Sequence, residues 1–255
     1  LHIITFNIPF PANYGGVIDV FYRIVALHEL GIHIHLHCFK FDREVTKELE
    51  KFCDKVYYYD RDMSWKNLLS SVPFIVKSRR ADVLTQRLKE NPFPILYDGI
   101  HCTATLHNPT LTQEKFIRTH NVEKNYYSHL AKNELNLITK LLLHFESFKL
   151  SVYEKRIYNA ESVLAISRCD QIYFSKFQKS HLIRAFHSNT FIQPKLGKGE
   201  YALYHGNLTV SENIKALQFL LKEVFLRIDL PIVVAGKIKS KKLVREIRKN
   251  PNIKL

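Results

Sequence analysis

The sequence predicts an α/β protein built on a doubly wound parallel sheet, followed by a second, incomplete unit of the same kind. Short, nearly continuous apolar runs, typical of strands buried on both faces, alternate with longer segments whose apolar residues recur at helical spacing. A polar stretch with one proline and two glycines interrupts this alternation. The chain has 255 residues, 46% of them hydrophobic, so it is long enough to fill a core.

The first forty residues predict a strand, a helix and a second strand. The run LHIITFNI at 1–8 is followed by the loop PFPANYGG and then by the helical pattern VIDVFYRIVALHELG, which closes at Gly31. Glycine suits the left-handed residue that follows a helix. The run IHIHLHCF at 32–39 then resumes the strand. A parallel βαβ unit explains this order.

The alternation continues to about residue 187. Strands are expected at 56–60, 94–98, 115–119, 162–167 and 181–187. Helices are expected at 43–55, at 64–90 with a break at Pro73, after Asn121, and at 134–160. Asn121 is the expected cap of its helix, and Glu123 should complement the helix dipole. Ser167 should cap the helix that follows the strand at 162–167, with Asp170 reciprocating.

The polar stretch SNTFIQPKLGKGE, residues 188–200, predicts a linker between two domains, 1–190 and 191–255. A second α/β pattern begins at once, with strands at 201–206 and 231–236 and helices at 211–228 and 240–250. Because few domains stop at the opening of a strand, we expect the second domain to be incomplete.

The formal net charge of +14 implies attraction to polyanions, which include nucleic acids, anionic lipid headgroups and phosphorylated small molecules. The basic residues are spread over several helical segments and no nucleic-acid-binding signature is present, so no nucleic-acid partner is expected. No apolar run approaches the roughly 20 residues that span a bilayer. A cytoplasmic protein is therefore expected.

Two places at the predicted carboxyl edge of the sheet are candidates for chemistry. Gly15 and Gly16 follow the first strand and precede a helix, where bare backbone and free N–H groups favour phosphate. A tight turn would also explain them. His120 directly follows the strand that ends in Arg118 and Thr119, and capping of the next helix leaves this imidazole unexplained. We therefore treat His120 as the leading catalytic candidate.

No metal site is expected. His33, His35 and His37 share one face of the second strand, but adjacent positions on one strand rarely surround an ion, so a polar row facing an edge is the better interpretation. The four cysteines are scattered without the spacing of metal ligands.

A segment rich in apolar residues, from Trp65 to Val76, precedes Lys77, Arg79 and Arg80. Apolar residues beside a basic cluster can dock on an anionic membrane, which gives a hypothesis of peripheral contact with the inner face of the membrane. The alternative, favoured on sequence alone, is a core helix that is kinked at Pro73 and has a charged exit.

Several segments, taken in order, resemble the GT-B glycosyltransferases, particularly the retaining family 4 group (glycosyl transferases group 1). They are the loop PFPANYGG before a helix containing Arg23, RTHNVE before an aromatic helix, VLAIS followed by Asp170, YHGNLTVSENIKAL, and VVAGK. The resemblance spans the whole chain. It implies that the second domain is truncated.

The resemblance implies two Rossmann-like domains across a cleft, the first for the acceptor and the second for most of a nucleotide-sugar. It implies hexosyl transfer with retention, to a glycan or lipid-linked acceptor, without metal or cofactor. His120 would lie by the transferred sugar. The implied donor or phosphate contacts are Gly15, Gly16, Gly206, Asn207, Gly236 and Lys237, and the implied acceptor-side or supporting residues are Tyr14, Asp98, Arg118 and Asn121.

Two departures from the family pattern stand out. Many members clamp the diphosphate with an arginine and a lysine, where this chain has Asn207 and, nearby, Glu212, with Asn213 at the helix start. The paired-glutamate motif that grips the donor would lie beyond Leu255, so these residues are not expected to transfer sugar by themselves.

Two other functions remain open from the sequence. A GT-B sugar-nucleotide epimerase would rely on a carboxylate acid/base, for which Asp98 is the obvious candidate. A basic α/β protein that binds nucleic acid is the second alternative.

Overall fold

The computed structural model describes residues 1–189, 191 and 197–255. The expected linker at 188–200 therefore falls partly, with Pro194, outside the described residues. The chain divides into two compact units, Leu1–Thr190 (unit 1) and Phe191–Leu255 (unit 2). The roles expected for the two units in binding acceptor and donor stay predictions.

Unit 1 contains a seven-stranded sheet in which every neighbouring pair of strands is parallel. Its order is β3-β2-β1-β4-β5-β6-β7. The strands are β1 (His2–Thr5), β2 (His35–Phe39), β3 (Lys55–Tyr59), β4 (Ile95–Asp98), β5 (Lys115–Thr119), β6 (Ser162–Ala165) and β7 (Ser180–Leu182). The chain order reverses between β1 and β4, and in doubly wound sheets ligands bind at such a switch point.

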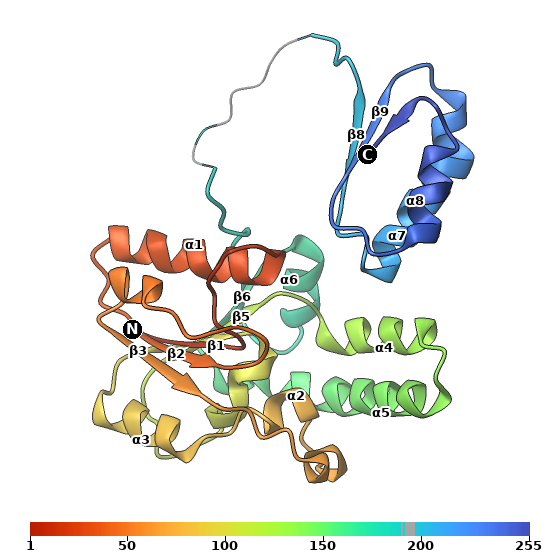
Figure 1. Ribbon diagram of the computed structural model, residues 1–255. Helices are drawn as coiled ribbons and strands as arrows, with labels where there is room; N and C mark the ends of the chain where they lie inside the picture. The colour runs from red at the N-terminus through yellow and green to blue at the C-terminus, as the bar shows by residue number, and fades with distance from the viewer. Residues whose placement is uncertain (190, 192–196) are drawn as a thin grey trace. The chain divides into compact units, whose positions relative to one another are not determined.

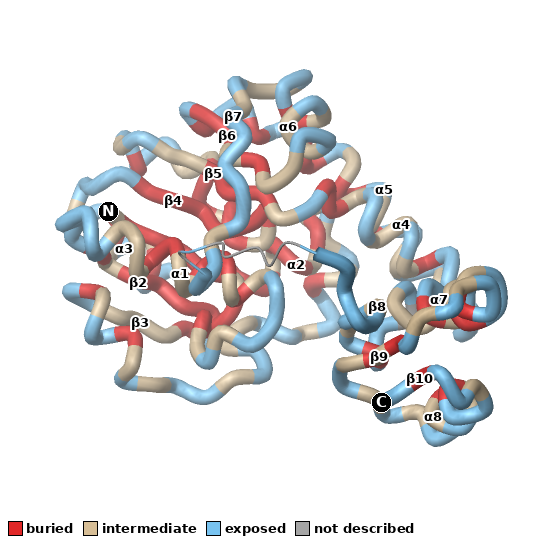
Figure 2. Tube along the Cα trace, turned by 90° about the horizontal axis from the view of Figure 1, so that it is seen from above, coloured by how far each residue is buried: buried red, intermediate tan, exposed pale blue. Residues whose placement is uncertain are grey.

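Helices cover both faces of this sheet, with α1 on one side and α2, α3 and α5 on the other (Figure 1). Ile3 and Leu36 pack with Val20 and Ile24 of α1 on one face. On the other face, Ile4, Tyr97 and Ile117 join a core cluster that includes side chains of α2, α3 and α5. The buried residues gather along the strands (Figure 2). The helices are α1 (Gly15–Glu29), α2 (Phe74–Lys77), α3 (Asp82–Glu90), α4 (Glu123–Asn133), α5 (Leu137–Tyr153) and α6 (Arg168–Phe174).

Two helix predictions are wrong. Only the 3₁₀ turn η1 (Glu48–Lys51) forms within 43–55. Polar side chains hold the rest of this segment, because Tyr58 donates its hydroxyl to the Thr46 carbonyl and Arg43 bonds the carbonyls of Ile8 and Pro11. The pattern at 64–90 divides into η2 (Trp65–Leu69), α2 and α3, with extended backbone at Pro73, the expected break, and also at Ala81.

The long helix expected at 134–160 is α5, which ends at Tyr153 and continues as the 3₁₀ helix η4 (Glu154–Asn159). Gly31 has a φ of 75°, as expected after α1. Ser167 caps α6 by accepting from the Asp170 N–H at 3.1 Å, and its hydroxyl donates to the Asp170 carboxylate, so this expected pair is confirmed. A further 3₁₀ helix, η3 (Ile100–Thr105), follows β4.

The histidines of β2 do not form a row at an edge, because β2 lies between β1 and β3 inside the sheet. His37 is fully buried, and its ring nitrogens lie 2.9 Å from His2 Nδ1 and 2.8 Å from the Tyr59 hydroxyl. Burial and the neighbouring His2 hold the pKa of His37 well below its usual value. These two histidines are therefore neutral members of a buried polar chain.

Unit 2 contains a parallel three-stranded sheet in the order β10-β9-β8. The strands are β8 (Ala202–His205), β9 (Ile232–Ala235) and β10 (Ile253–Lys254), with helices α7 (Ser211–Phe219) and α8 (Lys241–Arg248). The helix expected at 211–228 divides into α7, a π-helical turn η5 (Leu220–Val224) and the 3₁₀ turn η6 (Phe225–Arg227). Leu208, Leu217, Val234 and Ile247 anchor a separate core.

The fold class is confirmed in both of its components, a doubly wound Rossmann-like unit followed by a second Rossmann-like α/β unit, the pair that the GT-B type combines. Within the described ranges, no helix is long and apolar enough to cross a membrane.

Candidate active site

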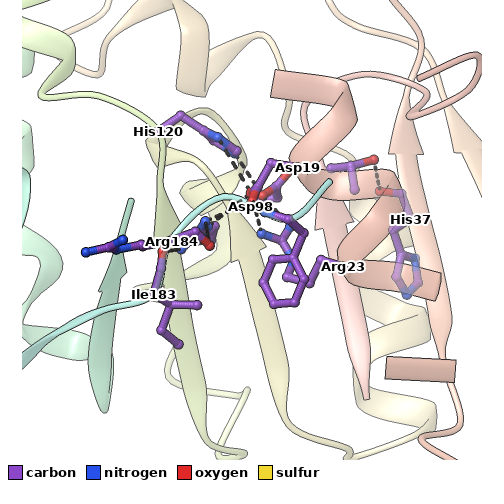
Figure 3. A network of polar contacts seen from close by, with 10 residues as sticks. Asp19, Arg23, His37, Asp98, His120, Ile183 and Arg184 are labelled. Carbon is purple, nitrogen blue, oxygen red and sulfur yellow. Dashed lines mark hydrogen bonds and ion pairs between the residues drawn. The ribbon is translucent and has the colours of Figure 1, made fainter. Parts of the chain in front are cut away.

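A buried network of charged side chains lies where β4 and β5 end, beside the switch point. Asp98 is the last residue of β4 and is paired in register with Arg118 of β5. His120 follows β5, while Asp19 and Arg23 reach the same place from α1 (Figure 3). The parallel arrangement brings residues far apart in the sequence to one edge of the sheet.

Asp19 is the central acceptor of this network. Its Oδ2 accepts from Arg23 Nη1 at 3.0 Å and from Arg118 Nε at 3.1 Å. Its Oδ1 accepts from Arg118 Nη2 at 2.9 Å and from the Phe186 backbone N–H at 2.9 Å. Asp19 and Arg118 are fully buried. Arg118 also donates to the carbonyls of Ile183 and Arg184, so the segment after β7 leaves the sheet fixed to this network instead of continuing the strand expected to 187.

Asp98 holds His120 in one orientation. Asp98 Oδ1 accepts from Arg23 Nη2 at 2.6 Å and lies 3.0 Å from His120 Nε2. Burial alone would raise the pKa of Asp98, but Arg23 and His120 outweigh it and lower this pKa to about 2. An ionised carboxylate can only accept hydrogen bonds, so His120 Nε2 carries a proton. Asp98 thus sets the tautomer of His120.

The other ring nitrogen of His120 is left as an acceptor in the neutral imidazole. Nδ1 lies 3.9 Å from Asp19 Oδ2 and has no hydrogen-bond partner among the described residues. The His120 side chain is 11% exposed, and the Phe6 ring packs against it with the centroids 5.7 Å apart. His120 is therefore held firmly while one polar atom remains unused.

Further unpaired polar atoms gather at this edge of unit 1. Among the described side chains, the buried nitrogen and oxygen atoms that lack a partner include Arg23 Nε, Arg61 Nε, Asp98 Oδ2, His101 Nδ1, Thr119 Oγ1 and His120 Nδ1. Buried polar atoms are rarely left unpaired, because each costs about 1–3 kcal/mol. These six atoms lie on α1 or near the carboxyl ends of the strands, where buried water or a polar ligand would satisfy them.

Asp19, Asp98 and His120 also bring potential metal-ligand atoms within 4.8 Å of one another. Arg23 and Arg118 donate to the same carboxylates, so both negative charges already have a buried counter-charge. A divalent cation would have to displace these guanidinium groups, and the donor set therefore does not fit a metal. Metal independence itself stays a prediction.

A second buried group surrounds Glu123, the first residue of α4. Burial and the nearby Glu154 carboxylate raise the pKa of Glu123 to about 8, against the lowering effect of Arg79. Arg79 is itself buried and donates to the carbonyls of Phe6 and Ile75. Glu123 is thus protonated at neutral pH and does not complement the helix dipole as expected. The expected cap is also wrong, because Val122 takes the N-cap position of α4 and Asn121 is exposed.

Replacing Glu123 by glutamine should remove a pH-dependent loss of stability. A carboxyl whose pKa is higher in the folded than in the unfolded state loses stability as pH rises, here between about 4.5 and about 8. We expect Glu123→Gln to match the parent protein at pH 5 and to be more stable at pH 8 by on the order of 2 kcal/mol. Urea unfolding at both pH values measures this, with the exposed Glu50→Gln as control. A parallel pH dependence in Glu123→Gln and the parent would contradict it.

The loop before α1 occupies a neighbouring part of the same edge. Tyr14 is the N-cap residue of α1 and is exposed, with the Arg43 guanidinium 5.0 Å from its ring centroid. Both residues line a cavity of about 570 Å³, together with Phe10, Asn13 and Asp42. A Cβ on Gly15 would meet nothing within 4 Å, whereas one on Gly16 would lie 3.1 Å from the Phe6 ring. Phe6 therefore connects Gly16 with His120.

In unit 2, Gly206 and Gly236 bring the loops after β8 and β9 into backbone contact. The Gly206 N–H donates to the Ala235 carbonyl at 3.1 Å. Gly236 has a φ of 144°, and a Cβ there would overlap the Gly206 carbonyl. Asn207 does not offer its carboxamide oxygen freely, because that oxygen accepts from the Thr209 N–H and hydroxyl. Lys237 is exposed beside the two loops.

A side chain at position 236 should separate these loops. We expect Gly236→Ala to destabilise unit 2 by more than about 3 kcal/mol, because it combines a backbone conformation that L-residues avoid with a steric overlap. Thermal unfolding followed by circular dichroism measures the effect. Gly15→Ala is the matched control, since its Cβ meets open space. Equal transitions for both variants would count against the proposed contact.

The structure thus joins Asp98, Arg118 and His120 in one network and places Gly16 beside it. The structure adds two residues to this network. Asp19 was not singled out from the sequence, and Arg23 was named there only as part of the family resemblance. The signal for both was an i, i+4 pair of opposite charges on the apolar face of α1, next to Val20 and Ile24.

No protein-family model matches the chain. Among curated proteins, the chain is similar to an uncharacterized 44.6 kDa protein in the cps region of Klebsiella pneumoniae, with 27% identity over an alignment of 259 positions that covers 93% of this chain. The chain spans 65% of the length of that relative.

Among solved structures, the chain is similar to UGT2 of Phytolacca americana complexed with UDP-2-fluoro-glucose and pterostilbene (TM-score 0.49, 10% identity). It is also similar to a UDP-glucose:anthocyanidin 3-O-glucosyltransferase in complex with UDP (TM-score 0.49, 11% identity). Each match covers 97% of this chain and 68% of the other.

Proposed function

We propose that this protein transfers a sugar from a nucleotide-sugar donor to a saccharide or lipid-linked acceptor. The observation that carries the proposal is His120, held by a buried and ionised Asp98 at the switch point of a Rossmann-like unit. The unpaired polar atoms around it suit a ligand with many hydroxyl groups, because each hydroxyl can both donate and accept.

His120 would contact a sugar through Nδ1. Asp98 keeps the proton on Nε2, so Nδ1 is left as an acceptor. Because Nδ1 is buried, a rotation of the side chain would bring it to a hydroxyl of the bound sugar or the acceptor. Asp19 and Asp98 flank the imidazole and would stabilise positive charge that develops on it. Arg23 and Arg118 position both carboxylates without touching the substrate.

Unit 2 supports the proposal through a glycine at the carboxyl edge of its sheet. Gly206 carries no side chain at the carboxyl end of β8, where a diphosphate could approach closely, whereas the place of a Cβ on Gly236 is filled by the Gly206 backbone. The family arginine is replaced by Asn207, whose carboxamide oxygen is engaged by Thr209. The exposed Lys237 would then supply the positive charge.

The finer assignments rest on the resemblance and on the relative. Retention of configuration, hexosyl transfer and metal independence follow the family that the sequence resembles. A relative located in a cps region supports a role in polysaccharide synthesis. The epimerase alternative is less favoured, because Asp98 is fully buried and its pKa of about 2 makes it a poor acid or base at neutral pH.

Thermal unfolding of the complete gene product with UDP, GDP and their sugars tests the proposal. We expect one nucleotide class to raise Tm, and its sugar donor to release nucleotide only when an acceptor glycan is present. Proton NMR of the product should show the donor's anomeric configuration. Donor isomerised without acceptor would favour the epimerase. Failure of every nucleotide, with steeply salt-dependent binding to a random oligonucleotide, would favour the nucleic-acid alternative.

A further inference from the structure

The outer face of α5 exposes a stripe of large apolar side chains. Ile138, Leu141, Phe145 and Phe148 recur at helical spacing along it, and Leu141 and Phe148 are 69% and 65% exposed. Trp65 and Leu69 of η2 are also exposed. We call these six residues the α5 surface. Isolated apolar residues are normal on a protein surface, but a continuous stripe indicates an interaction site.

The orientation of this stripe is fixed by buried polar contacts on the neighbouring face of α5. Glu146 accepts from the Phe74 N–H at 2.7 Å and forms an ion pair with Lys149. Lys149 donates to the carbonyls of Leu68 and Ser70 at 3.1 and 3.2 Å, which holds η2 against α5. The Lys149 ammonium also lies 5.0 Å from the Phe145 ring centroid. The stripe therefore faces outward because the helix is anchored.

Lysines slightly outnumber acidic groups among the accessible charged side chains of η2, α4, α5 and their flanks. Lys66 and Lys132 are exposed and Lys140 is half-buried, whereas the acidic side chains are the exposed Asp62 before η2 and the half-buried Glu134 between α4 and α5. The carboxylates of Glu123 and Glu146 are buried inside the protein. An apolar stripe beside lysines complements an anionic, partly apolar partner.

We propose that the α5 surface docks on an anionic lipid bilayer, with α5 lying in the plane of the headgroups. The helix has 17 residues, hence a length of about 25 Å at 1.5 Å per residue. A second copy of the chain is a poorer occupant, because a two-fold axis would bring the lysines of one copy against those of the other. Of the 65–80 segment named in the membrane hypothesis from the sequence, Trp65 and Leu69 belong to this surface, whereas Ile75 and Val76 are buried.

The fluorescence of Trp65 tests the proposed docking on a bilayer without any mutation, because Trp65 is the single tryptophan of the chain. We expect its fluorescence to shift to the blue when vesicles of phosphatidylglycerol are added, and to be quenched by brominated acyl chains. Vesicles of pure phosphatidylcholine should bind the protein at least about tenfold more weakly, and salt should weaken the anionic binding. Vesicle binding without a change in Trp65 fluorescence would place the contact on another surface and overturn the proposal.

Paired variants give the second test, by co-sedimentation with phosphatidylglycerol vesicles. Leu141→Glu/Phe148→Glu should reduce partitioning by at least about tenfold. The control, Leu30→Glu/Val83→Glu, adds the same charge at exposed apolar positions elsewhere in unit 1 and should bind nearly as the parent does. Circular dichroism verifies that both are folded. Equal sedimentation of the two variants would contradict the proposal. It would also be contradicted if the parent protein were a dimer that did not bind vesicles and that Leu141→Glu/Phe148→Glu made monomeric. The outcome does not depend on the proposed sugar transfer.

Discussion

Replacing Asp19 by alanine should destabilise unit 1 by about 3–5 kcal/mol, a large part of the stability of a typical domain. The variant leaves the fully buried Arg118 without its carboxylate and the Phe186 N–H without its acceptor. Arg23 would still have Asp98. The main cost is therefore the unpaired charge of Arg118 in the core.

Urea unfolding followed by circular dichroism measures this effect. The matched control is Asp60→Ala, which removes the ion pair between Asp60 and Lys40. The Asp60 side chain is 86% exposed. Such exposed pairs contribute about 0–1 kcal/mol, so the control should change little. If Asp19→Ala unfolded at the same urea concentration as Asp60→Ala, the network would not be the anchor described above.

Replacing His120 by alanine should lower the rate of sugar transfer by about 10²–10⁴-fold, the range typical of a lost acid/base or hydrogen-bonding group. Its effect on stability should be small, about 1 kcal/mol, because Asp98 keeps its bond to Arg23. The combination of a large loss of rate and a small loss of stability is what separates a catalytic histidine from a structural one.

The measurement is kcat and KM of the complete gene product together with its Tm. The exposed His129→Ala on α4 is the control and should retain the parent rate. An unchanged kcat for His120→Ala would remove His120 from the mechanism. A fall in kcat that parallels a large fall in Tm would assign it to the structure instead.

Much of unit 1 could be predicted from the sequence, because strands buried on both faces are continuous apolar runs. β4 and β5 lie within the expected ranges for this reason. The segment at 43–55 could not be predicted, because its backbone is held by Arg43 and Tyr58, whose contacts depend on the folded chain. The apolar period of α5 was read correctly as helical, but a period does not tell whether its apolar side faces a core or the solvent.

The candidate site was predicted in part for a related reason. Asp98, Arg118 and His120 converge because residues at the ends of neighbouring parallel strands share an edge. Asp19 and Arg23 lie on a helix, where their i, i+4 pair of opposite charges is a local signal. Their contacts with Asp98 and Arg118 join residues distant in the sequence, which no local pattern encodes. The protonated state of Glu123 likewise depends on the approach of Glu154 and on burial.

The Asp19 carboxylate also has a consequence for the order of folding. It joins positions 19, 118 and 186, separations that raise the contact order of unit 1. During synthesis, Asp19 and Arg118 emerge before the Phe186 N–H and the carbonyls of Ile183 and Arg184 that complete their bonds. We therefore expect the sheet core to form early and the site at its edge to close late, once the segment after β7 has been made.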